Sequence, residues 1–191
     1  MTFKQFLIIT TCAAALLITL VSVSRAQERK REYITAIAQG TSQQLGTMIN
    51  VTIIINELST AEDQKVLIDA FRAGRSKGLA NAVDKMSSKG RISVTGTVGY
   101  DLNYVREFIQ PDGSRKIRFV TDRPINFREA WYSGRSMDYA LSMGEIIIRG
   151  DRDSNSGTLM PIAKFKLDRE KELTIETFRN PWKLVNIKAH D

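Results

Sequence analysis

The alternation of apolar and polar residues predicts a protein built mainly of β-strands. From Arg91 onward, short alternating segments follow one another and are separated by turn-forming Gly, Pro, Asn and Asp residues. Short antiparallel strands at this spacing are typical of a β-sandwich or a β-barrel. The predicted strands are 33–38, 47–57, 92–98, 103–110, 115–121, 126–132, 136–142, 145–149, 158–167, 172–178 and 184–188.

A helical pattern interrupts the strands between residues 59 and 88. Ser59-Thr60-Ala61-Glu62 has the spacing of a capping box, and Gly74 is a natural helix end. Two apolar stripes flank Gly74, the first formed by Val66, Leu67, Ala70 and Phe71 and the second by Leu79, Ala82, Val83 and Met86. The pattern therefore predicts an αα-hairpin inserted between strands, and the fold class is α+β with β dominant.

Residues 1–26 have the pattern of a secretory signal peptide. An uncharged run from Phe6 to Ser24 precedes Ser24-Arg25-Ala26, which places small residues at the two positions that a signal peptidase reads before Gln27. The run is also just long enough to span a membrane and basic residues follow it, so an uncleaved anchor is the alternative, with the rest of the chain exported or cytoplasmic. We expect 27–191 to be a single β-rich domain, secreted or periplasmic, at the membrane only if the segment is uncleaved.

Composition narrows the possible chemistry. The chain has one Cys, Cys12 in the amino-terminal run, and one His, His190, so the sequence excludes a structural disulfide and argues against a multi-His metal site or a His-based triad. Removing residues 1–26 takes away Lys4 and Arg25 and no acidic residue, so the net charge falls from +7 to +5. This modest basic excess suits an anionic surface and does not by itself imply nucleic acid. We expect no cofactor.

Five segments of the chain carry a resemblance. They are TAIAQGT, NVTIIINELSTAEDQKVLIDAF, GRISVTGTVGYDL, RKIRFVTDRPINF and NPWKLVNI. These segments are similar to an uncharacterised family of predicted secreted bacterial proteins, and the similarity extends over nearly all of 27–191. The resemblance implies one exported domain of this length, and it implies no activity, ligand or site residue.

The candidate binding residues are basic and aromatic. Arg106 shares one face of its predicted strand with Tyr104 and Phe108, and Lys116 and Arg118 share one face of the next. Basic strands with interleaved aromatics bind anionic glycans or single-stranded nucleic acid, and export argues against nucleic acid. The alternative places the aromatics in the core and the arginines in water. Two further candidates for a carbohydrate or partner site, with a core position as their alternative, are Trp131 and Tyr132.

Metal binding and catalysis have little support in the sequence. The loop 151–157 places oxygen ligands at alternate positions, in Asp151, Asp153 and Asn155. It lacks the Gly and Glu that an EF-hand calcium loop requires, so we expect a solvated turn and no metal. Without an internal His, a hydrolase would need a pair of carboxylates or a Ser–Lys pair, and Ser87-Ser88-Lys89 lacks the Ser-x-x-Lys spacing. The available carboxylates, of which no spacing selects two, are Asp101, Glu107, Asp122, Glu129, Asp138 and Glu145.

These observations favour a non-catalytic exported domain that binds an envelope component, a protein partner or a small apolar ligand. The expected partner surface is anionic or a protein, and nucleic acid is not expected. A carboxylate-based hydrolase acting on glycans is the alternative. A third hypothesis is a carrier that closes its β-structure as a barrel around a ligand cavity.

Overall fold

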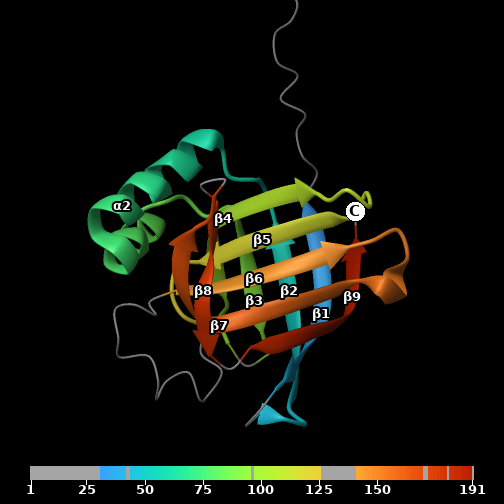
Figure 1. Cartoon of the computed structure of the whole chain (residues 1–191). Helices are drawn as coiled ribbons and strands as arrows, with labels where there is room; N and C mark the ends of the chain where they lie inside the picture. Colours follow the sequence, from blue (N-terminus) through green and yellow to red (C-terminus); the bar gives the residue numbers. More distant parts are fainter. Residues whose placement is uncertain are drawn as a thin grey trace, which may run out of the picture.

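The computed structural model describes residues 31–41, 44–95, 97–125, 141–169, 172–179 and 181–190 (Figure 1). The predicted signal peptide, the strand 126–132 with Trp131 and Tyr132, and most of 136–142 lie outside the described residues. The described elements are β1 (Glu32–Gly40), β2 (Met48–Ile55), α2 (Ala61–Asp84), β3 (Gly90–Val94), β4 (Tyr100–Ile109), β5 (Arg115–Thr121), β6 (Leu141–Ile148), η3 (Arg152–Ser154), β7 (Ser156–Leu167), β8 (Leu173–Arg179) and β9 (Trp182–His190).

Eight of these strands close into an antiparallel barrel in the order β1-β2-β3-β4-β5-β6-β7-β9. The ring closes because β7 pairs with β6 on one edge, and the first part of its other edge pairs with β9. The rest of that second edge pairs with β8, which therefore lies outside the ring. The closed barrel confirms the β-dominant class, and a barrel is found where the sequence left a barrel or a sandwich open.

A packed hydrophobic core fills the barrel. Alternate residues of each strand point inward, as the strand period requires. The inward-pointing side chains include Ile34, Ile53, Ile92, Leu102, Phe119 and Trp182, all of which are buried. A Cβ on Gly144 of β6 would lie 2.1 Å from Cζ of Phe119, so a glycine is needed where this ring crosses the strand. The interior is therefore built as a core of interlocking side chains.

The helix α2 lies beside the barrel (Figure 1), and a second apolar layer joins it to the outer face of the sheet. The helix contributes Leu67, Phe71, Leu79 and Val83. The facing residues lie on β4 to β8 and include Tyr104, Val120, Leu141, Met143, Met160, Phe165 and Leu173. Because these strands bury residues on both faces, part of the sheet lies between two cores.

The predicted αα-hairpin near 59–88 is not confirmed. In the described segment 59–88 the structure has a single α-helical element, α2, which is broken at Arg75, where φ is 49°. The buried stripe also differs from the expected one, because Val66 is 53% exposed and Ile68 is buried in its place. Within the described residues, no helix is both long and apolar enough to cross a membrane.

The helix begins one residue later than the capping-box spacing predicts. Thr60 Oγ1 accepts a hydrogen bond from the Asp63 amide, and the Asp63 carboxylate accepts one from the Thr60 amide. Ser59 is instead bound to β4: its amide donates to the Val105 carbonyl, and its hydroxyl accepts from the Val105 amide. The contact with β4 fixes which of two adjacent capping boxes forms.

Candidate functional site

Two rows of side chains cross the outer face of the barrel. The strand register places Arg106 of β4 opposite Arg118 of β5, and Arg118 opposite Glu145 of β6. The same row continues to Thr158 of β7 and Lys183 of β9. The second row consists of Phe108, Lys116, Ile147 and Ser156.

Four of these residues form what we call the Phe108 patch: Arg106, Phe108, Lys116 and Arg118. The guanidinium carbons of Arg106 and Arg118 lie 5.9 and 5.3 Å from the centre of the Phe108 ring, and Lys116 Nζ lies 6.0 Å from it. These distances are within the range of cation–π attraction. Phe108 is only half-buried, so one aromatic ring of this hairpin stands among cations at the surface. The three predicted basic residues therefore come together.

Two carboxylates that the sequence did not single out as partners neutralise the arginines of the patch. Arg106 Nη2 lies 3.1 Å from Glu172 Oε1, and Arg118 Nε lies 2.6 Å from Glu145 Oε1. Arg118 also donates to the Leu173 carbonyl and is only 8% exposed, so the alternative that placed all the arginines in water is wrong here. Lys116 makes no ion pair with any described residue. It is the cation of the patch that remains available to a partner.

A buried tyrosine lies close to the arginines of the patch. Tyr104 is fully buried, and its hydroxyl has no hydrogen-bond partner among the described residues. Burial raises the pKa of this hydroxyl, and the charge of Glu172 raises it further. The phenol therefore stays protonated at ordinary pH. Tyr104 is a structural residue beneath the patch, since it offers no surface to a partner.

Replacing Tyr104 by Phe should stabilise the protein. The substitution removes a buried hydroxyl without a described partner and keeps the ring in the second core, so we expect a gain of about 1 kcal/mol in the free energy of unfolding. Urea denaturation measures this directly. Tyr33→Phe, at an exposed site, should change stability by less than about 0.5 kcal/mol. A clear loss of stability in Tyr104→Phe would show that the hydroxyl is hydrogen-bonded.

Four of the carboxylates considered for a hydrolase are paired with arginine. Arg115, at the inner side of β5, donates to Glu32 over 3.1 and 2.8 Å and also to Glu107. The hydrogen bonds to Glu32 raise the pKa of Arg115 and keep it charged. The other pairs are Arg91 with Asp101, Arg123 with Asp122, and Arg118 with Glu145.

This pairing leaves these carboxylates engaged with arginine side chains. A glycosidase instead needs two carboxylates that face the substrate together. Of the six carboxylates considered for a hydrolase, four are paired in this way, and Glu129 and Asp138 lie outside the described residues. The described residues therefore give no support to the hydrolase hypothesis.

Comparison with known proteins identifies no family for this chain. No protein-family model, curated protein or solved structure matches the chain. The resemblance to secreted bacterial proteins therefore stays a prediction. The case for a function rests on the described side chains.

The loop considered for a cation is held by its own hydrogen bonds. Asn155 Oδ1 accepts from the Arg149 amide over 2.7 Å, and Asp151 Oδ1 accepts from the Asp153 amide over 3.2 Å. These side-chain oxygens cap the turn through η3. The described part of the chain contains no group of three or more His, Cys, Asp or Glu residues arranged to hold a metal ion.

Proposed function

We propose that the protein is a non-catalytic exported domain that binds an anionic component of the cell envelope through the Phe108 patch. The observation that carries the proposal is a half-exposed aromatic ring with three cations around it, on the outside of a closed barrel. Lys116 supplies charge that the described chain does not neutralise. The ring supplies apolar area beside it, so acidic groups attached to a carbon skeleton match both features.

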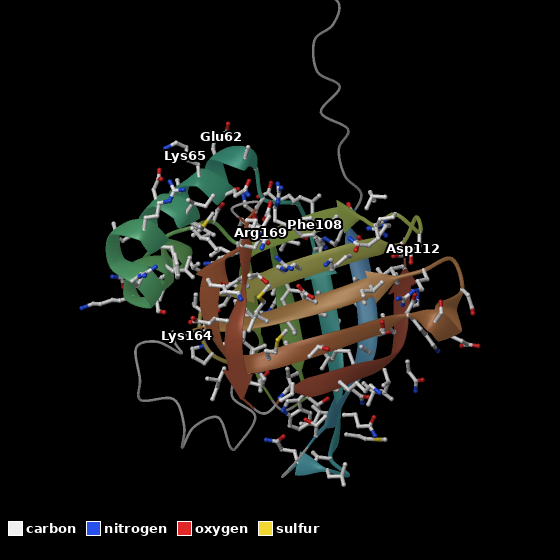
Figure 2. The ribbon with its side chains drawn as sticks, viewed as in Figure 1. Glu62, Lys65, Phe108, Asp112, Lys164 and Arg169 are labelled. Carbon is white, nitrogen blue, oxygen red and sulfur yellow. The ribbon has the colours of Figure 1, made fainter. Side chains whose placement is uncertain are left out.

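The surroundings of the patch support an anionic partner. Exposed Arg169 lies in the turn between β7 and β8 (Figure 2). Glu172, at the end of the same turn, pairs with Arg106. The packed interior favours binding outside the barrel, because an apolar ligand inside would have to displace core side chains. Export and an envelope location rest on the predicted signal peptide.

Reversing the charge of Lys116 should weaken binding to anionic membranes. We expect Lys116→Glu to lower the affinity for vesicles that contain phosphatidylglycerol by about tenfold or more, since each basic residue near such a surface contributes about 1 kcal/mol. Co-sedimentation with purified protein measures this. Lys77→Glu on α2 is the matched control, because Lys77 is exposed and lies away from the patch.

The same assay can contradict the proposal. Binding should weaken as the salt concentration rises, because the interaction is at the surface. Equal binding to phosphatidylcholine vesicles, or equal loss of binding in Lys116→Glu and Lys77→Glu, would overturn a specific role for the patch. Repeating the binding assay with polygalacturonate in place of vesicles distinguishes binding to an acidic glycan from binding to a lipid headgroup.

A further inference from the structure

A groove of about 540 Å³ lies on the outer face where β6, β7 and β9 meet. Its volume is within the range of roughly 300–1,000 Å³ that is usual for small-ligand sites. It lies next to the Phe108 patch, because Glu145 borders the groove and also binds Arg118. The proposed function makes no use of it.

A β-bulge brings an extra polar side chain into the groove. Along the β1–β9 pair, Thr35 is opposite Lys188 and Ile37 is opposite Val185, so Asn186 and Ile187 together face the single residue Ala36. Asn186 has φ of 51°, a left-handed conformation that Asn tolerates better than most residues. Ile187 then returns to the core, and Val185 and Asn186, although adjacent in sequence, both line the groove. Bulges often re-aim side chains at sites of function.

The groove offers several polar groups that the described chain does not use. Thr158, Lys183, Asn186 and Asp153 line it, and their side chains have no hydrogen bond or ion pair with described residues. Lys183 and Asp153 carry opposite charges, so together they add no net charge. Ile147 and Val185 add apolar area beside these polar groups.

This chemistry excludes several ligand classes. Strand addition is blocked, because β6, β7 and β9 are paired on both edges along the groove. The balance of charge disfavours a polyanion, and the number of polar groups disfavours a lipid tail. A ligand with many hydroxyls and an apolar face matches hydroxyl, amide, carboxylate and ammonium groups placed around two aliphatic side chains.

We propose that this groove binds a neutral saccharide. Thr158, Asn186 and Asp153 hydrogen-bond to its hydroxyls, and Ile147 and Val185 contact the C–H face of its ring. Lys183, opposite Thr158, donates to a further hydroxyl or ring oxygen. The site is independent of the Phe108 patch, and either one can fail without the other.

Nuclear magnetic resonance titration of the isotope-labelled protein tests the site. The probes are maltose, cellobiose and N,N′-diacetylchitobiose. We expect at least one of them to shift amide signals of β6, η3, β7 and β9 at the groove, in a saturable way. The absence of shifts with all three disaccharides, or shifts located elsewhere on the barrel, would overturn the proposal.

Two substitutions test the residues that carry the site. Asn186→Gly keeps the left-handed backbone and removes the amide, and Thr158→Val keeps the shape and removes the hydroxyl. Each should raise the dissociation constant about tenfold, as the loss of one well-placed hydrogen bond does. Thr52→Val on β2 is the control and should bind as the wild type does. Wild-type affinity in both groove variants would contradict the assignment.

The two sites can be separated in one set of proteins. Lys116→Glu should keep its saccharide affinity while it loses binding to anionic vesicles. Asn186→Gly should show the reverse behaviour. If Lys116→Glu abolishes saccharide binding as well, the groove is not an independent site and the proposal fails in this form.

Discussion

Phe71→Ala is expected to lower the free energy of unfolding by about 3–5 kcal/mol, the usual cost of deleting a buried aromatic side chain. Phe71 is 6% exposed and lies in the layer between α2 and the outer face of the barrel. The guanidinium of Arg75, at the helix break, also lies 5.7 Å from the centre of its ring. Because a broken helix of this length is marginal by itself, its contact with the sheet holds it in place.

Two variants on the same helix serve as controls for Phe71→Ala. Val66→Ala should cost less than about 1 kcal/mol, because Val66 is 53% exposed although the sequence stripe predicted it to be buried. Arg72→Ala, next in sequence and exposed, should be as mild. Urea unfolding compares the three variants when the dependence of the free energy of unfolding on urea concentration is fitted as one shared slope. If Phe71→Ala matches the two controls, α2 is not held by this ring, and the surface beneath it is open to a partner.

The strands could be predicted because their signal is local. A strand with one buried face alternates at every second residue, and β5 has the bounds Arg115–Thr121 that the pattern indicated. The same alternation placed Arg106 on one face of its strand and Lys116 and Arg118 together on one face of the next, and the hairpin register brings these two faces to the same side of the sheet. Closure into a barrel depends on β7 pairing with β6 and β9, contacts between distant segments that alternation does not encode.

The predictions that differ from the structure concern positions where tertiary contacts decide between two similar local structures. Ser59 and Thr60 can each begin a capping box, and the contact of Ser59 with Val105 decides between them. Burial of Ile68 in place of Val66 depends on which face of the helix meets the sheet. These outcomes depend on tertiary packing, and the hydrophobic pattern of one segment contains no information about that packing.

The groove was missed for a similar reason. Its Asn186 is presented by a bulge in the β1–β9 pair, and a lone Asn within a strand-like segment carries no signal of this kind. Glu145 and Glu172 could not be assigned to their arginines, because those pairs join β5 to β6 and β4 to the turn before β8. Asp153 was noted for a different chemistry, and in the structure it faces the groove.

Gly144→Ala should destabilise the barrel by about 3 kcal/mol, at the upper end of the usual cost of overpacking a core. The new Cβ would lie 2.1 Å from Cζ of Phe119 and less than 3 Å from two further ring atoms. The ring has little room to move, because Phe119 is fully buried inside the closed barrel. Thermal or urea unfolding measures the loss. Gly150→Ala is the matched control and should stay within about 0.5 kcal/mol of the wild type, since nothing lies within 4 Å of the added methyl group.

A second substitution tests the cause of the Gly144 effect. Phe119→Leu alone should cost about 1–2 kcal/mol, because it leaves part of the ring's space unfilled. Combined with Gly144→Ala, the smaller side chain leaves room for the new methyl group, so the double variant should be more stable than the sum of the two single losses predicts. Strict additivity would mean that the glycine is needed for the backbone of β6. A barrel closed around Phe119 requires coupling between the two sites.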